Sequence, residues 1–278
     1  MARAESILVA ASMVLYAAGF LLTLASLLTG RERAFAVGRW ATVAGLAAHT
    51  AALGIRWAVE GHVPVATPHE NASVGAWSIV VFALAGARGR TYRSSGVGAL
   101  ALALLILGWA TTQDSSHIPF VASLRSVWLY VHVGFAFLAY ASFSIASGTA
   151  LVYLIKTRRG GGGVLSRVPP LDELDRTGYR YVVFGFITCA VMIAAGAIWA
   201  KDLWGAYWSW DPVETWSLVS WLAYGILIHL RVTYGWSGRR FAWFALLAVS
   251  LVIVAYFGVT SVFKATQHVF TVPAPPTF

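Results

Sequence analysis

A short aromatic run contains the residue types best suited to a specific ligand. Residues 204–216 read Trp-Gly-Ala-Tyr-Trp-Ser-Trp-Asp-Pro-Val-Glu-Thr-Trp, so four tryptophans and one tyrosine fall within thirteen residues: Trp204, Tyr207, Trp208, Trp210 and Trp216. Single tryptophans commonly anchor membrane proteins at the interface. A cluster this dense instead offers several flat aromatic faces to one ligand. The run therefore predicts a platform for a large planar molecule.

Two carboxylates in the run could act as a general acid and base, but their spacing favours a structural role. Asp211, Pro212 and Glu214 stand before an apolar segment in the order of an N-cap, a first helical residue and the third residue of a capping box. The sequence therefore predicts that a helix begins here. Trp204 and Trp208 would share a face if the preceding run were helical, with Trp210 directed elsewhere.

Two histidines flank the aromatic run in the sequence. His132 lies near the start of one apolar segment, and His268 lies just beyond the last. Two facing imidazoles suit the axial positions of heme iron, although imidazole also binds zinc or copper. A single interfacial histidine is also often bonded to water or to the backbone. No cluster of cysteines or carboxylates accompanies this pair in the sequence, and the surroundings are aromatic, which favours a porphyrin over a bare ion.

The other histidines fall into two groups. His49 and His229 lie within apolar segments, where an ionisable side chain is costly, so each is a candidate for an internal site. The alternative is a neutral histidine that bonds a backbone carbonyl between helices. His62, His69 and His117 lie in predicted outer loops, where we expect them to be solvated.

Composition indicates an all-α integral membrane protein. Hydrophobic residues make up 59% of the 278 residues and charged residues 11%, against about 25% charged residues in soluble domains. The formal net charge is +9, but the basic residues lie in short connections between apolar segments, so nucleic-acid binding is not expected. One cysteine, Cys189, excludes an internal disulfide and any CxxC chemistry. The first apolar segment is too long for a signal peptide, and we expect it to be a retained helix.

Eight segments are candidates for membrane helices, because a spanning helix needs about 20 apolar residues. They are residues 6–28, 40–59, 72–87, 96–111, 126–155, 181–200, 216–234 and 241–263. The connections after the first, third, fifth and seventh segments carry most of the 20 lysines and arginines. These connections are therefore predicted to be cytoplasmic, which places both termini and the aromatic run on the outer side.

Two regions are predicted. Residues 1–125 form a four-helix membrane region with an outer loop at 60–71, and residues 126–278 contain the last four helices with the tryptophan-rich outer loop at 200–216. A glycine run at 160–163, followed by Pro169 and Pro170, predicts a flexible linker within the second region. No internal repeat relates the two regions.

The run at 204–216 resembles the WWD signature of heme-handling proteins in cytochrome c biogenesis, which the CcsA/ResC, CcmC and CcmF branches share. Other stretches resemble the CcsA/ResC branch of System II: Gly196-Ala-Ile-Trp-Ala200, Trp216-Ser-Leu-Val-Ser-Trp221, Ile228-His-Leu-Arg231, Tyr256-Phe-Gly-Val259, and Gly61-His-Val-Pro-Val65 with Glu70. The resemblance is strong from about residue 126 to 268 and weaker over the first hundred residues.

The chain departs from that branch at several positions. Val213 stands where the family usually has lysine, and Thr260 where it usually has asparagine. His268 lies in Thr-Gln-His-Val-Phe rather than Gly-Leu-His-Ser-Tyr, and residues 67–70 read Thr-Pro-His-Glu rather than Asn-Leu-Tyr-Glu. The chain is thus expected to be a divergent member.

The resemblance implies roles for matching residues. His132 and His268 would ligate the iron of heme b, and His229 would lie on the path of heme from the inner side. The porphyrin edge would be held by the aromatic residues of the run: Trp204, Tyr207, Trp208, Trp210 and Trp216. None of the residues suggests a general base, so no catalytic residue is predicted.

The resemblance further implies a function at the outer face of a membrane, most simply the bacterial inner membrane with the run facing the periplasm. The chain would be a subunit of a cytochrome c heme lyase, which presents heme to the CxxCH thiols of apocytochrome c for thioether formation. A CcsB/ResB-type membrane partner would complete it. The alternative is a heme exporter or carrier without ligase activity, as in CcmC, or a heme-binding subunit of another complex.

Overall fold

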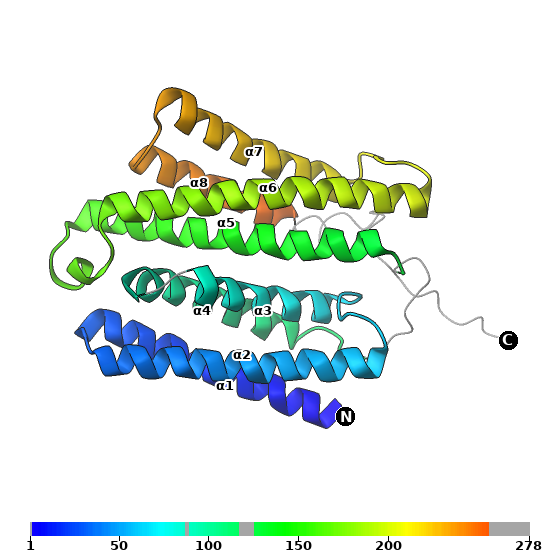
Figure 1. Ribbon diagram of the computed structural model, residues 1–278, viewed down its shortest axis with the longest axis horizontal. Helices are drawn as coiled ribbons and strands as arrows, with labels where there is room; N and C mark the ends of the chain where they lie inside the picture. Colours follow the sequence, from blue (N-terminus) through cyan, green and yellow to red (C-terminus); the bar gives the residue numbers. More distant parts are fainter. Residues whose placement is uncertain (1, 87–88, 117–124, 256–278) are drawn as a thin grey trace.

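The computed structural model describes residues 2–86, 89–116 and 125–255, and most of these are helical (Figure 1). Eight α-helices lie within the described residues: α1 (Ala2–Thr29), α2 (Glu32–Glu60), α3 (Pro68–Gly86), α4 (Gly89–Ala110), α5 (Val127–Arg159), α6 (Leu171–Trp204), α7 (Pro212–Tyr234) and α8 (Arg239–Ile253). A short 3-10 helix, η2 (Gly163–Arg167), lies between α5 and α6. The expectation of an all-α protein is confirmed.

Each of the eight predicted apolar segments coincides with a helix, although the end of the eighth lies outside the described residues. Four described helices, α1, α5, α6 and α7, are long and apolar enough to cross a membrane. The apolar part of α4, Ser95–Ala110, is shorter. These helices make the chain an integral membrane protein, as composition predicted.

Helix α5 lies at the centre of the bundle. It packs against α6 and α8 on one side and against α3 and α4 on the other, while α1 pairs with α2. The buried hydrophobic residues form two main clusters, one among the first four helices with Ala141 of α5 and one among the last four. Figure 1 shows the α1–α2, α5–α6 and α7–α8 connections at one end of the bundle and the α2–α3 and α6–α7 connections at the other.

Local sequence explains where the helices beside the α2–α3 and α6–α7 connections begin and end. Gly61 and Gly205 follow α2 and α6 in the left-handed conformation, with φ of 72° and 81°, which glycine adopts without a Cβ clash. Helix α3 begins with a reciprocal box: the backbone N–H of Glu70 donates to Thr67 Oγ1 (3.1 Å), and Thr67 N–H donates to Glu70 Oε2 (3.3 Å). Helix α7 begins with a second such box at Asp211 and Glu214.

Two loop histidines differ from expectation. His62 and His69 were expected to be solvated, but both are buried. His69 Nδ1 bonds the carbonyl of Ala110 (2.8 Å), and His62 Nδ1 bonds that of Val63 (2.9 Å). The expectation is wrong because the α2–α3 connection folds back against the ends of its neighbouring helices. His117 lies outside the described residues, whereas Cys189 is buried in the core, as expected.

Candidate functional site

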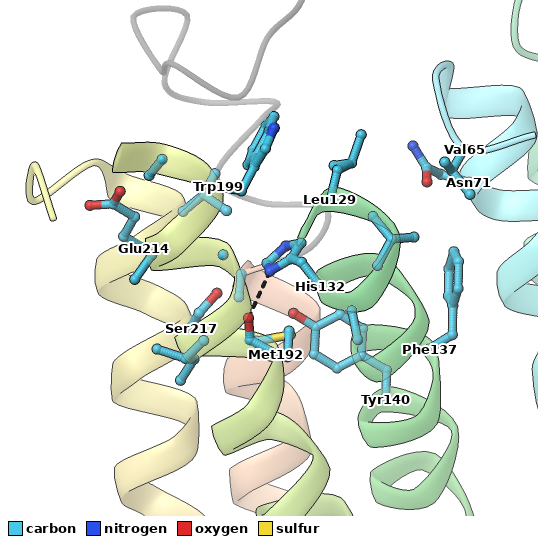
Figure 2. Close-up of a pocket in the computed structure, with 18 of the residues that line it drawn as sticks. Val65, Asn71, Leu129, His132, Phe137, Tyr140, Met192, Trp199, Glu214 and Ser217 are labelled. Carbon is cyan, nitrogen blue, oxygen red and sulfur yellow. Dashed lines mark hydrogen bonds between the residues drawn. The ribbon is translucent and has the colours of Figure 1, made fainter. Parts of the chain in front are cut away.

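A cavity of about 560 Å³ opens beside the tryptophan-rich loop (Figure 2). Helix α5 contributes one continuous face to it, with residues that recur at helical spacing: Leu129, His132, Val133, Ala136, Phe137 and Tyr140. Helices α6 and α7 supply one side wall, and the α2–α3 connection, α3 and the end of α4 supply the other. The volume lies within the range of about 300–1,000 Å³ that small-molecule sites occupy.

His132 lies in this lining with its ring orientation set by the backbone. Its Nδ1 atom bonds the carbonyl of Met192 at 2.8 Å (Figure 2). Because a carbonyl can only accept, Nδ1 carries the proton in the neutral ring and the lone pair resides on Nε2. This arrangement, with one ring nitrogen bonded to a backbone carbonyl, is the one that metal-ligating histidines use.

Gly196 allows this arrangement. A Cβ at position 196 would lie 2.5 Å from His132 Nδ1 and 2.9 Å from Cε1 of the same ring. Any larger residue would therefore displace the imidazole from its place against α6. Trp199, one turn further along α6, lies with its ring 6.5 Å from that of His132, at an interplanar angle of 26°.

The tryptophan-rich loop is not helical. Helix α6 ends at Trp204, and residues 205–211 turn back before α7 begins. The idea that Trp204 and Trp208 share one helical face therefore does not hold, because Gly205 ends the helix between them. Trp204 instead packs edge-on against Trp199, with ring centroids 5.3 Å apart.

Other aromatic residues of the loop take different positions. Tyr207 and Trp208 line the cavity. Trp210 is 71% exposed and has a left-handed backbone with φ of 59°, which is uncommon for a large residue. Its ring meets that of Trp208 edge-on at 5.9 Å. The loop thus divides its aromatic side chains between the cavity and the outer surface.

The two acids of the run hold this loop, as the spacing predicted. Asp211 Oδ1 accepts from the backbone N–H of Val213 (2.9 Å), and the full capping box with Glu214 is present. Glu214 Oε2 also accepts from Ser209 N–H (2.9 Å) and Ser209 Oγ (3.2 Å). Glu214 lines the cavity as well. One carboxylate therefore ties the loop to the start of α7 at the edge of the cavity.

Of the remaining predicted residues, His229 and Trp216 are not among the described residues that line the cavity. His268 lies outside the described residues. His229 is exposed near the far end of α7, about 22 Å along the helix axis from Glu214. Its ring packs edge-on against Tyr234. Trp216 lies in the first turn of α7 and is not among the described residues that line the cavity.

His49 belongs to a separate, buried arrangement. It lies between the Tyr16 hydroxyl, at 3.3 Å, and Ser73 Oγ, at 2.9 Å, and so links α1, α2 and α3. The expected backbone partner is replaced by two hydroxyl groups. Both ring nitrogens are engaged with neighbouring helices, which identifies a structural connection within the first four helices.

Sequence reasoning missed one wall of the cavity. The first half of the chain contributes residues from three segments: Val65, Ala66, Pro68, Asn71, Trp109 and Gln113. Figure 2 shows Val65 and Asn71 across the cavity from Glu214, with His132 between them. Sequence reasoning also missed Trp199 as a cavity residue. Residues 192, 193, 196, 197 and 200 of the same helix line the cavity at helical spacing. That spacing, directly before the aromatic run, was the available signal.

The described part of the chain holds no group of three or more His, Cys, Asp or Glu side chains that could bind a metal ion. The lining has one imidazole, mostly apolar neighbours and four other polar side chains, Asn71, Gln113, Glu214 and Ser217. A single imidazole suits an iron that arrives already coordinated by a porphyrin. The size of the cavity, its aromatic lining and the lone pair on His132 Nε2 all fit heme.

The family model described as "Cytochrome C assembly protein" matches residues 70–266. The chain belongs to this family. It is 33% identical over 242 residues to the cytochrome c biogenesis protein CcsA of Synechococcus sp. (strain CC9902), covering 76% of this chain and 79% of that protein. CcsA of Guillardia theta is 32% identical over 251 residues, covering 82% and 83%. The resemblance to the CcsA branch is confirmed.

A solved structure shares the fold. The chain superimposes on the cytochrome c heme lyase CcmF with a TM-score of 0.67 and 18% identity. The match covers 90% of this chain but 45% of that one, so this chain spans less than half of CcmF. The family match to residues 70–266 includes the cavity residues of α5, α6 and α7 together with Asn71, Trp109 and Gln113, whereas Val65, Ala66 and Pro68 lie just before it.

Proposed function

We propose that this member of the cytochrome c assembly family binds heme in the outer cavity and presents it for covalent attachment to apocytochrome c. His132 is the proposed iron ligand, and heme b is the substrate. The observation that carries the proposal is the hydrogen bond from His132 Nδ1 to the Met192 carbonyl, which turns Nε2 into a ligand atom within a 560 Å³ aromatic cavity. His268 is the proposed second ligand.

The proposed orientation places the cavity on the outer side of a bacterial inner membrane, with eight membrane helices and both termini outside. Support comes from the connections at one end of the bundle, which carry most of the basic residues, as cytoplasmic connections do. On α2, Trp40 and Trp57 are 73% and 53% exposed. They lie about 26 Å apart along the helix, a spacing close to the thickness of the hydrocarbon core.

The proposed chemistry is addition of two cysteine thiols of a CxxCH motif across the two vinyl groups of heme. Each S–H adds to one C=C bond, so each thioether forms without an external oxidant. The chain's own residues would contribute orientation: His132 fixes the iron, while Tyr207 and Trp208 face the ring. Holding both reactants in one geometry is worth a large part of such a barrier. This makes the chain a proposed subunit of a cytochrome c heme lyase of the System II type.

Two further roles complete the proposal. A CcsB/ResB-type partner would bring the apocytochrome to the outer face, where Trp210 is exposed beside the cavity. His229, at the opposite end of α7, would meet heme as it enters from the cytoplasmic side.

The division into regions 1–125 and 126–278 is likewise proposed, and the separate hydrophobic clusters of α1–α4 and α5–α8 support it.

Heme binding is tested first on the purified chain in detergent. Absorption spectra and heme titrations are compared for wild type, His132→Ala, His268→Ala and His229→Ala. We expect loss of the two-histidine spectrum in the first two variants and an unchanged titration in His229→Ala. Heme carried by protein isolated from cells should nevertheless fall in His229→Ala. A wild-type spectrum in His132→Ala would rule out the proposed cavity.

Attachment is tested by co-expression with a CcsB/ResB-type partner and an apocytochrome that contains CxxCH. We expect heme that stays with the apocytochrome through acid-acetone extraction, and its loss in His132→Ala. Loaded heme in the chain without covalent product, in the presence of the confirmed partner, would favour a carrier that lacks ligase activity.

A further inference from the structure

A buried ionic network lies behind one wall of the cavity. We call this wall the first-half wall; it consists of Val65, Ala66, Pro68, Asn71, Trp109 and Gln113. Arg56, near the end of α2, is 3% exposed, and its guanidinium contacts carboxylates on three helices. They are Glu70 Oε1 on α3 (2.8 Å), Glu5 Oε1 on α1 (3.2 Å) and Glu60 Oε1 on α2 (3.5 Å). The sequence analysis assigned no role to Arg56, so this network was not predicted.

The same guanidinium also holds the segment that follows α4. Arg56 Nη1 donates to the carbonyl of Ser115 at 3.0 Å, and Nη2 donates to that of Ser116 at 3.5 Å. Trp109, near the end of α4, and Gln113, within the segment, both line the cavity. One side chain therefore connects α1, α2 and α3 to the segment between α4 and α5.

Glu70 extends the network to the α2–α3 connection. One of its oxygens accepts from Arg56, while the other, Oε2, accepts from the backbone N–H groups of Ala66 (2.7 Å) and Thr67 (3.3 Å). Val65, Ala66 and Pro68 of this connection line the cavity. The Arg56–Glu70 pair thus holds the α2–α3 connection and the segment that follows α4. Neither residue lines the cavity itself.

The opposite wall has a matching device. Residues 67–70 read Thr-Pro-His-Glu and residues 211–214 read Asp-Pro-Val-Glu, and both form a capping box with proline at the first helical position. In each case the glutamate also accepts from a backbone N–H of the preceding loop, Ala66 in one and Ser209 in the other. The cavity lies between these two helix starts. The difference is that Glu70 is buried and paired with Arg56.

Stability alone is a poor reason for this network. Burying charged groups is costly, and well-packed apolar residues often stabilise a protein at least as well. Arginine offers five N–H donors in a rigid fork, which fixes several partners at once. A guanidinium that bonds four segments at once is suited to fixing the positions of these segments relative to one another.

We propose that Arg56 and Glu70 are positioning residues for the heme cavity, holding the α2–α3 connection and the segment after α4 as its first-half wall. This inference rests on the heme site proposed above. Substituting either residue allows the α2–α3 connection and the segment after α4 to move, and this weakens heme binding. His132 and its contact with Met192 stay in place.

The test uses the full chain in detergent and a cysteine probe in the wall. Val65→Cys places a thiol at a buried position of the α2–α3 connection, and Cys189 is buried and slow to react. The rate of maleimide labelling without heme then reports opening of the wall. Heme affinity is measured separately in chains that keep Val65. Neither readout depends on attachment activity.

Glu70→Gln and Glu5→Gln form a matched pair, since each neutralises one carboxylate bonded to Arg56 and only Glu70 reaches the wall. We expect Glu70→Gln and Arg56→Lys to raise labelling and to weaken heme binding by roughly tenfold each, because removing one partner of a buried pair is costly. Glu5→Gln also removes a partner of Arg56, but Glu5 does not accept from Ala66 or Thr67, so labelling and heme affinity should change by less than about twofold.

One further variant keeps both charged residues, so that its effect cannot come from a buried charge left without its partner. Ala66→Pro removes the N–H that donates to Glu70 while leaving Arg56 untouched, and it should raise labelling in the same direction. Equal effects of Glu5→Gln and Glu70→Gln would overturn the proposal, as would faster labelling with unchanged heme affinity. If His132→Ala binds heme like wild type, the proposed function is wrong, and the labelling series alone decides whether the network positions the wall.

Discussion

His132 on α5 donates a hydrogen bond from Nδ1 to the backbone carbonyl of Met192 on α6, at 2.8 Å. One turn further along α6, Gly196 leaves the room that the imidazole occupies. Helices α5 and α6 therefore position the proposed iron ligand through a backbone carbonyl and the absence of a Cβ at Gly196.

Gly196→Ala should weaken heme binding more than it weakens the fold. The added Cβ would lie 2.5 Å from His132 Nδ1, so the ring must move. Overpacking of this kind costs about 1–3 kcal/mol, and we expect a roughly tenfold or greater loss of heme affinity. Gly134→Ala on α5 is the control, since a Cβ there meets nothing within 4 Å. Equal heme affinity in both variants would contradict the positioning of His132 described here.

Glu214→Ala should loosen the tryptophan-rich loop. It removes the acceptor of Ser209 N–H and Asp211 N–H, and loss of a helix cap typically costs about 0.5–2 kcal/mol. We expect faster proteolysis within residues 205–211 and weaker heme binding. Asp202→Asn, which removes a neighbouring exposed carboxylate from the end of α6, should change neither. A loop in Glu214→Ala as protected as in wild type would show that the cap does not hold it.

Local patterns in the sequence were sufficient for some of these features. The cap at Asp211 and Glu214 depends on residues three apart, so its chemistry can be recognised without a fold. The place of His132 near the start of α5, at the same end of the bundle as the aromatic run, followed from its position near the start of an apolar segment. The contact with Met192 could not be predicted, because it joins residues sixty positions apart and depends on the absence of a side chain at Gly196.

The contacts that hold the first-half wall could not be predicted from local sequence patterns. Arg56, Glu5 and Glu70 come from three helices, and no sequence spacing indicates that they meet. His62 and His69 were expected to be solvated because both were predicted to lie in a loop. His62 lies in the α2–α3 connection and His69 in the first turn of α3, and packing against neighbouring residues buries both. Long-range packing, rather than local preference, decided each of these positions.

Asp175→Asn should destabilise the end of the bundle at the α7–α8 connection without changing heme binding. The Asp175 carboxylate accepts hydrogen bonds from Arg231 Nη1 at 3.1 Å, from Arg231 Nη2 at 2.6 Å and from the backbone N–H of Gly238 at 2.8 Å. The pair is largely buried, and we expect a loss of about 1–3 kcal/mol, measured as a lower midpoint in thermal unfolding. Asp172→Asn on the same helix breaks an exposed pair with Arg176 and should leave the midpoint unchanged. A parallel loss of heme affinity in Asp175→Asn would indicate coupling between the two ends.

His49→Ala should act on stability and leave the heme spectrum intact. The imidazole bridges Tyr16 and Ser73, and its removal leaves two buried hydroxyl groups without that partner, at a cost of about 1–3 kcal/mol. Ser73→Ala removes one of the two contacts and should produce a smaller loss, which serves as the graded control. Thermal unfolding and heme titration are compared with those of His132→Ala. A changed heme spectrum in His49→Ala would place a second ligand within the first four helices and would reopen an internal heme site.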